Sequence, residues 1–247
     1  MILFCIPYSG GGAEAFAGWR EALAPTVDVR VAALPGRGER FGVPLVRDMP
    51  TLVEQMAEQC ESWSSEPFAL LGYSFGAAVA YALTLHLQQR GRAPRRLIAG
   101  AARAPFLPHV GPMRHQMADP ALIAELVAFG ATDPAVLADD ELMRVYLPIL
   151  RSDFEVAETY RPAEQKVACP LSVFGGTRDV FTPVADLKLW SRLSDRDTNV
   201  RLYEGGHFVL HTHRARICRA VRADLALDAY GVTATTPDRS DIEDIAR

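Results

Sequence analysis

The sequence predicts an α/β fold with a mostly parallel central sheet and helices on both of its faces. Along most of the 247 residues, short apolar segments alternate with longer segments of helical periodicity, which is typical of strands joined by helical crossovers. The apolar segments are nearly continuous, as expected for strands that are buried on both faces. Hydrophobic residues make up 49% of the chain, so there is enough apolar material for one large core.

The order of the elements follows from these segments. Right-handed crossovers between the strands would wind the chain through a single, doubly covered sheet. The expected strands are residues 2–6, 29–34, 68–72, 96–101, 171–176 and 200–205. The expected helices are residues 14–23, 50–64, 75–90, 182–193 and 209–228.

The interval 107–162 interrupts this alternation, because it contains no convincing strand. We expect it to be a helical lid inserted over the strand ends, with an ordinary satellite layer of helices as the alternative. Residues 1–106 and 163–230 are then a single core domain. The last segment, 231–247, is polar and is expected to be a C-terminal tail.

Within this interval, local signals mark where its helices begin and end. The stretch "DPALIAELVAFG" has an apolar face, with Asp119 as a candidate N-terminal cap and Gly130 as a candidate stop. The stretches "DDELMRVYLPIL" and "RSDFEVAETY" predict two further helices, and Pro148 is expected to bend the first of them.

The composition and charge of the chain exclude several classes of function. The net charge is −4, so neither nucleic acid nor an anionic membrane is expected as a partner. The four cysteines are scattered without a C-x-x-C pair, so neither a disulfide framework nor a zinc site is predicted. The N-terminus lacks the basic region of a signal peptide, and no apolar run reaches the roughly 18 residues of a membrane span. We therefore expect a cytoplasmic protein, with a monomer as the default state.

The segment "LLGYSFGAAVA" at 70–80 is the first candidate for chemistry. It places the pentapeptide GYSFG, centred on Ser74, between an apolar strand and a helix of small residues, which is the G-x-S-x-G context of a serine nucleophile. The flanking glycines permit a turn tight enough to expose the hydroxyl, and the helix N-terminus offers donors for an oxyanion. A glycine-rich turn without a nucleophile is the alternative. Tyr73 is expected to contribute packing.

A serine nucleophile requires a base and an acid, which are expected in the chain order Ser, Asp or Glu, His, each after a later strand. Asp179 follows a strand and a glycine pair in "LSVFGGTRDVFTP", and His207 does so in "VRLYEGGHFVL". The glycine pairs let both loops fold tightly enough to bring these side chains over Ser74. Asp186 and Glu204 are the more distant rivals for the acid.

The remaining histidines are weaker candidates for the base. His86 is expected on the flank of the helix that follows Ser74, and His211 and His213 at solvated positions of a later helix. His109 and His115 fall at the start of the predicted lid, where a contact with substrate remains an alternative.

An oxyanion hole is the third element that serine chemistry requires. One donor is expected to be the backbone N–H of Phe75, the residue after the candidate nucleophile. The glycine-rich loop "IPYSGGG" at 6–12 follows an early strand, and its pattern points to the N–H of Ser9 as the second donor. The loop matches neither glycine-rich pattern that binds phosphates, because it lacks both G-x-x-x-x-G-K-[ST] and G-x-G-x-x-G.

Together these residues resemble the type II thioesterases of the α/β-hydrolase superfamily, the stand-alone enzymes that accompany polyketide synthases and nonribosomal peptide synthetases. The resemblance spans residues 2–230. It rests on "PYSGGGAEAFAGW", "LPGRGER" (34–40), "LLGYSFGA", "ARAP" (102–105), "FGGTRD" and "GGHF". The role of "LPGRGER" does not follow from spacing. The stretch before "ARAP" is Gly100-Ala101, where Ser-Gly is commoner in the family.

The resemblance implies that Ser74, Asp179 and His207 form a catalytic triad, with Ser9 and Phe75 supplying the oxyanion N–H groups. It also implies a substrate bound as an acyl thioester to the phosphopantetheine arm of an acyl carrier or peptidyl carrier protein, usually a stalled or aberrant acyl group. No metal or resident cofactor is expected, because the phosphopantetheine belongs to the partner. Two alternatives remain: an esterase or lipase for small oxygen esters, and a catalytically silent protein of this fold that only docks a carrier.

Overall fold

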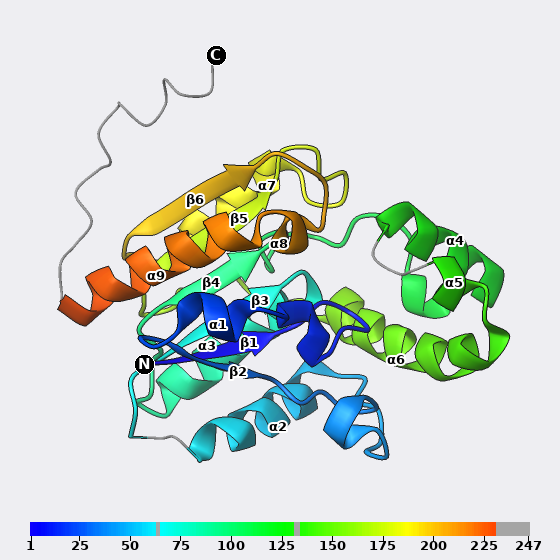
Figure 1. The fold of residues 1–247 in the computed structure, drawn as a ribbon, viewed down its shortest axis with the longest axis horizontal. Helices are drawn as coiled ribbons and strands as arrows, with labels where there is room; N and C mark the ends of the chain where they lie inside the picture. Colours follow the sequence, from blue (N-terminus) through cyan, green and yellow to red (C-terminus); the bar gives the residue numbers. More distant parts are fainter. Residues whose placement is uncertain (63–64, 131–133, 231–247) are drawn as a thin grey trace.

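The computed structural model describes residues 1–62, 65–130 and 134–230. Its centre is a parallel sheet of six strands in the order β2-β1-β3-β4-β5-β6, shown in Figure 1. This confirms the predicted fold class. The strands are β1 (Ile2–Ile6), β2 (Asp28–Val31), β3 (Phe68–Tyr73), β4 (Leu97–Gly100), β5 (Leu171–Gly176) and β6 (Thr198–Tyr203).

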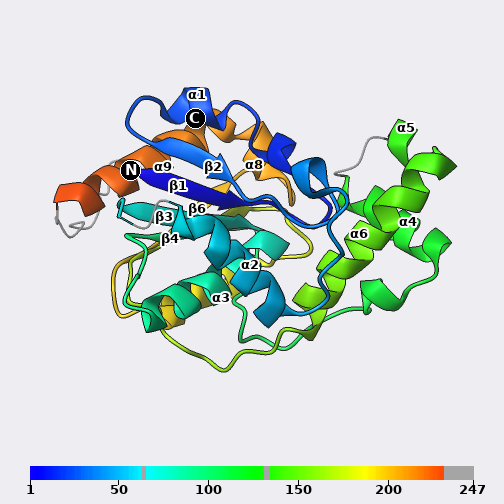
Figure 2. The same cartoon turned by 90° about the horizontal axis from the view of Figure 1, so that it is seen from below.

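Helices cover both faces of the sheet (Figure 2). One face packs on α1, α8 and α9 around a core that includes Trp19 and Ile217. The other packs on α2, α3 and the α7–η4 segment around Met56, Leu83 and Trp190. The helices are α1 (Trp19–Leu23), α2 (Met49–Glu61), α3 (Phe75–Gln89), α7 (Val184–Lys188), α8 (Val209–Thr212) and α9 (Arg214–Tyr230), with 3-10 helices η1 (Ala13–Phe16), η2 (Gly38–Arg40) and η4 (Leu189–Leu193).

The expected strands are all present, with boundaries that shift by a few residues for local reasons. The expected strand 96–101 ends at Gly100, because Ala101 turns the chain with a positive φ of 45°. The expected helix 14–23 is divided into η1 and α1, because Gly18 between them adopts a left-handed conformation with φ of 75°. The strands are buried nearly throughout β1, β3, β4 and β5, as their continuous apolar sequences predict.

The chain between β4 and β5 contains a group of helices at the carboxyl ends of the strands (Figure 1). We call residues 107–162 the insertion. Leu122 and Leu126 of one helix pack with Leu147 and Leu150 of another in a small core of their own. The elements of the insertion are η3 (Arg114–Gln116), α4 (Asp119–Phe129), α5 (Pro134–Leu137) and α6 (Asp140–Thr159).

Two details of the insertion differ from the sequence expectation. The two helices expected at 139–150 and 151–160 form one continuous helix, α6, with Pro148 inside it. Its apolar face continues past the proline, from Leu147 in the small core to Val156 in the main core, and this packing outweighs the hydrogen bond that proline removes. Asp119 is the first residue of α4 rather than its cap, and its carboxylate pairs with Arg151 at 2.5 Å.

The expected tail, 231–247, lies outside the described residues. Within the described part of the chain, no helix combines the length and the apolarity that crossing a membrane requires.

Candidate active site

Ser74 lies on a sharp turn between β3 and α3. Its backbone has φ of 54° and ψ of −119°, a strained conformation for a residue with a side chain. A Cβ on Gly72 would lie 2.0 Å from the carbonyl oxygen of Gly76, and a Cβ on Gly76 would lie 2.1 Å from that of Ile6. Both flanking positions therefore require glycine, and the turn presents the serine hydroxyl at the carboxyl edge of the sheet.

The structure brings Ser74, Asp179 and His207 into one chain of contacts. Nε2 of His207 is 3.0 Å from Oγ of Ser74, and Nδ1 is 2.8 Å from Oδ2 of Asp179. The second carboxylate oxygen of Asp179 accepts the backbone N–H groups of Phe181 at 2.9 Å and Thr182 at 3.2 Å. Both members of the acid–base pair are buried, so the carboxylate is directed at the imidazole rather than at solvent.

Tyr73 holds the loop that carries His207. Its phenol donates to the carbonyl oxygen of His207 and accepts the N–H of Leu210 at 3.4 Å. Burial raises the pKa of Tyr73 far above its ordinary value, so the phenol stays protonated as a donor. The sequence suggested only packing for this residue. A buried tyrosine beside a nucleophile was the available signal, since a buried phenol needs a hydrogen-bond partner.

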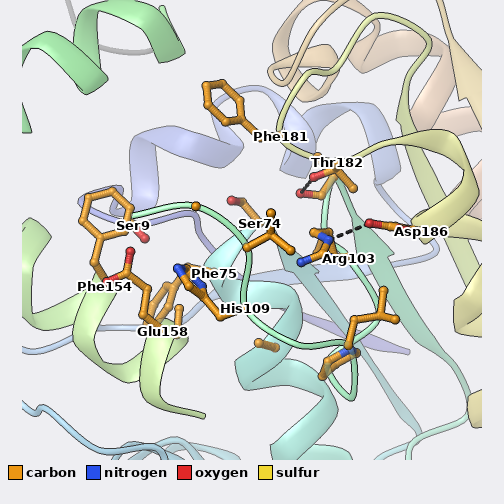
Figure 3. Close-up of a pocket in the computed structure, with 18 of the residues that line it drawn as sticks. Ser9, Ser74, Phe75, Arg103, His109, Phe154, Glu158, Phe181, Thr182 and Asp186 are labelled. Atoms are coloured by element: carbon orange, nitrogen blue, oxygen red, sulfur yellow. Dashed lines mark hydrogen bonds and ion pairs between the residues drawn. The ribbon is translucent and has the colours of Figure 1, made fainter. Parts of the chain in front are cut away.

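Ser9 and Phe75 line the same cavity as Ser74 (Figure 3). Phe75 is the first residue of α3, so its N–H has no acceptor within the helix. The N–H of Ser9 and that of Phe75 have no hydrogen-bond acceptor among the described residues. Neither N–H group is therefore committed to another part of the described chain.

The rival candidates for the acid and the base form contacts with residues other than Ser74. Asp186 pairs with Arg103 at 2.6 Å in one wall of the cavity, and Glu204 is an exposed partner of Arg178. His211 contacts the phenol of Tyr8 at 3.3 Å.

Two further histidines belong to the insertion or its approach. His115 places Nδ1 2.7 Å from the buried carboxylate of Glu158 and is not itself among the residues that line the cavity. His109 lines the cavity, where a contact with substrate stays an expectation.

The cavity at Ser74 has a volume of about 540 Å³, within the usual range for small-molecule sites. Core loops supply one wall, including Arg103 and Thr182, and the insertion supplies the other, including Phe154 and Glu158 (Figure 3). A second, smaller cavity of about 50 Å³ adjoins Ser74 and His207 on the side of Tyr146 and Leu150.

An aromatic stack covers His207. The rings of Phe129, at the end of α4, and Phe181, in the loop after Asp179, lie 3.9 Å apart between centroids. Both rings contact the imidazole at 5.7 Å, and the guanidinium of Arg114 lies 5.2 Å from the Phe129 ring. The stack excludes water from one side of the base, which strengthens the hydrogen bond to Asp179.

No metal centre is apparent: in the described part of the chain, no group of three or more His, Cys, Asp or Glu side chains is arranged to hold an ion.

Comparison with known proteins gives consistent matches. The family model described as "Thioesterase domain" matches residues 1–225. "Thioesterase PikA5" of Streptomyces venezuelae is 37% identical over 242 residues, covering 96% of this chain and 83% of that protein. "Gramicidin S biosynthesis protein GrsT" of Aneurinibacillus migulanus is 33% identical over 91% of this chain and 90% of its own length. The solved structure of the "RedJ-Thioesterase from the Prodiginine biosynthetic pathway in Streptomyces coelicolor" superposes with a TM-score of 0.84 at 30% identity, covering 91% of this chain and 90% of its own.

Proposed function

Because this chain belongs to the thioesterase family and is a thioester hydrolase, we propose that it hydrolyses acyl thioesters on the phosphopantetheine arm of carrier proteins through an acyl-Ser74 intermediate. The similarity to proteins of gramicidin S and prodiginine biosynthesis supports a polyketide or nonribosomal peptide pathway as the setting. Within such a pathway, the proposed role is to remove aberrant or stalled acyl groups.

In the first step, Nε2 of His207 takes the proton of the Ser74 hydroxyl while Oγ attacks the thioester carbonyl. The carbonyl oxygen becomes an oxyanion, which accepts the N–H groups of Ser9 and Phe75. The carbon–sulfur bond then breaks, and the pantetheine thiol leaves with the proton from His207. The product of this step is an acyl ester of Ser74.

In the second step, His207 takes a proton from water, and the resulting nucleophile attacks the acyl ester. A second oxyanion forms in the same hole and collapses, releasing the carboxylic acid and returning the proton to Ser74. Asp179 fixes the imidazole tautomer and stabilises its protonated form throughout. No step requires a metal or a resident cofactor.

The observation that carries this proposal is the contact chain from Asp179 through His207 to Ser74, at 2.8 and 3.0 Å, which opens onto the 540 Å³ cavity. We propose that the insertion acts as the lid of this cavity, because Arg114, Phe129 and Phe154 line it from above the strand ends.

The test is hydrolysis of acyl groups loaded on a carrier protein by Ser74→Ala. We expect kcat to fall by about 10⁴-fold or more, with folding unchanged. The control is Ser9→Ala, which keeps the backbone N–H and should retain kcat within about threefold of the parent. A fluorophosphonate should label Ser74 in the parent and not in Ser74→Ala. Parent-like turnover by Ser74→Ala would refute the nucleophile.

A second measurement addresses the substrate. Rates on acyl groups from acetyl to long chains, each on a carrier protein, are compared with rates on p-nitrophenyl esters of the same acids. We expect the carrier thioesters to be preferred in kcat/KM. Preference for the oxygen esters would instead favour an esterase.

A further inference from the structure

The segment "LPGRGER" contains an arginine that reaches the insertion. Arg37 forms a bidentate ion pair with Asp153 of α6, with Nη1 to Oδ2 and Nη2 to Oδ1 both at 2.7 Å. Only 11% of the Arg37 side chain and 6% of the Asp153 side chain are exposed. Removing either partner of such a buried pair leaves the other charge uncompensated, which is strongly unfavourable.

The same ion pair holds the loop that carries Ser9. Oδ2 of Asp153 accepts the backbone N–H of Gly10 at 2.7 Å, and Nη1 of Arg37 donates to the carbonyl oxygen of Gly11 at 3.2 Å. The two partners of the ion pair thus bind two consecutive residues of the loop: Asp153 binds Gly10 and Arg37 binds Gly11. Gly10 is held with φ of 76°, and a Cβ there would lie 2.5 Å from the Tyr146 hydroxyl, so the loop rests directly on α6.

These contacts fix the peptide group next to the expected oxyanion donor. The N–H of Gly10 points at Asp153, which sets the plane of the Ser9–Gly10 peptide. The N–H of Ser9, one peptide earlier, has no acceptor among the described residues and borders the cavity. Arg37, Gly10 and Asp153 line neither cavity at Ser74, so their effect reaches the substrate through the loop.

Arg37 is itself held in place by the rest of its segment. Arg40 donates to the carbonyl oxygen of Ala33 at 3.1 Å and to the side chain of Gln55 at 2.8 Å. The N–H of Gly36 bonds to the carbonyl oxygen of Arg40 at 2.9 Å. The turn between β2 and α2 is therefore a fixed support for the guanidinium.

We infer that Arg37 and Asp153 are positioning residues for the oxyanion hole, which orient the Ser9 N–H through their contacts with Gly10 and Gly11. The inference rests on the proposed function, because that proposal assigns the Ser9 N–H to the oxyanion. It gives "LPGRGER" a mechanistic role and makes the insertion part of the catalytic machinery as well as a wall of the cavity.

The test uses three variants of the full chain. Asp153→Ala removes the acceptor of the Gly10 N–H, Asp153→Asn keeps an oxygen acceptor without the charge, and Arg37→Lys keeps the charge without the fork. The substrate is the butyryl thioester of N-acetylcysteamine, at a temperature where circular dichroism shows each variant folded. We expect kcat to fall about 10²-fold for Asp153→Ala and about tenfold for the two conservative variants, with KM within about twofold.

A second readout reports the oxyanion hole directly. Butylboronic acid forms a tetrahedral adduct with the nucleophile, and one oxygen of this adduct occupies the position of the oxyanion. We expect its inhibition constant to rise across the variants in proportion to the loss of kcat/KM. A purely structural role would lower the melting temperature without this proportionality.

Two matched controls separate positioning from stability. Arg96 and Asp228 form another buried bidentate pair, with both contacts at 2.7 Å, remote from the cavity. Arg47 and Glu155 join the β2–α2 connection to α6 at 2.8 Å without touching the Ser9 loop. We expect Asp228→Asn and Glu155→Gln to change stability while kcat and boronate affinity stay at parent values.

The outcomes are distinct. Folded Asp153→Asn and Arg37→Lys with parental kcat and boronate affinity would overturn the inference. An equal loss of kcat in Asp228→Asn would also overturn it. Activity that persists in Ser74→Ala would refute the proposed function itself, whereas an inactive Ser74→Ala with fully active Asp153 variants would refute the positioning role alone. If Asp153→Ala does not fold, the two conservative variants decide.

Discussion

The acid–base half of this site, Asp179 and His207, and its proposed oxyanion half, the Ser9 loop, are built differently. Asp179 and His207 reach Ser74 through side chains on two neighbouring strand ends, β5 and β6, and their contacts are local to the core. The Ser9 loop is held by residues from the β2–α2 connection and from the insertion. The contact chain of the first half therefore runs between core loops, with the ring of Phe129 from the insertion beside His207, whereas the second half is hydrogen-bonded to the insertion directly.

Because of this difference, we expect that proton transfer by His207 and stabilisation of the oxyanion can be perturbed separately. Changes in the first half should abolish proton transfer and leave the oxyanion hole intact. Changes in the second should weaken binding of the tetrahedral state and leave Ser74 reactive to the extent that His207 activates it. The variants below test this separation, in order of decreasing expected effect.

The largest effect is expected for Asp179→Asn. The amide of asparagine can donate to Nδ1 of His207, which would leave the proton on Nε2, where a base must accept it. We expect kcat to fall by about 10⁴-fold while KM changes little, measured by steady-state hydrolysis of a carrier-bound thioester. A loss of less than tenfold would place the acid elsewhere, and Asp186→Asn is the control, with a parental or mildly reduced rate.

Gly76→Ala should impair both the acid–base half and the proposed oxyanion half, because Gly76 packs between the Ser74 turn and the segment that leads into the Ser9 loop. It packs directly against the backbone of Ile6 and Pro7, which lead into the Ser9 loop, and a Cβ would lie 2.1 Å from the Ile6 oxygen. We expect a destabilisation of roughly 3 kcal/mol or more and a kcat at least about 10²-fold lower in the folded fraction.

Chemical denaturation and hydrolysis rates together provide the measurement for Gly76→Ala. The control is Gly91→Ala, at a left-handed position where no atom lies within 4 Å of the added Cβ. It should lose only a small amount of stability and no activity. A Gly76→Ala variant with parental stability would contradict the close packing of β1 against α3.

Tyr73→Phe should affect the acid–base half alone. It removes the donor to the His207 carbonyl oxygen and the acceptor for the Leu210 N–H, which leaves buried groups unpaired. We expect a loss of about 1–3 kcal/mol in the free energy of unfolding and about a tenfold fall in kcat. The affinity for the boronate should change less in Tyr73→Phe than in Asp153→Asn. An equal change would argue against two separable halves.

The smallest effect is expected from His211, which contacts Tyr8 of the Ser9 loop. Partial desolvation lowers the pKa of His211 below its ordinary value, so folding favours the neutral ring. The stability this gives is present above the unfolded pKa of about 6.5 and is lost as pH falls through the lowered folded pKa. We expect His211→Gln to flatten the decline in melting temperature between pH 7 and pH 5, with kcat nearly unchanged. An unaltered decline would show that other groups cause it.

The sequence predicts the positions of Ser74, Asp179 and His207, but it does not predict the contacts that hold the Ser9 loop. Ser74, Asp179 and His207 each stand in a local motif of strand, glycine and loop, so their positions could be expected from residues nearby in the chain. The Arg37–Asp153 pair joins positions 116 residues apart, and no periodicity or spacing relates them. The helix that carries Asp153 was also expected as two helices, 139–150 and 151–160, rather than as the single helix α6. Long-range contacts between a loop and an inserted helix depend on how the whole chain packs, which local patterns do not encode.

The order of the strands has a consequence for how such enzymes diversify. The Ser9 loop and the Ser74 turn follow the adjacent strands β1 and β3, the loops of Asp179 and His207 follow β5 and β6, and the insertion leaves the sheet from β4 between them. The insertion can therefore be lengthened, shortened or replaced without changing the connections that carry Ser74, Asp179 and His207. Under the proposed positioning role, the bond from Asp153 to Gly10 limits that freedom. An exchanged insertion must then bring its own acceptor for the Gly10 N–H, or the Ser9 loop loses its support from α6.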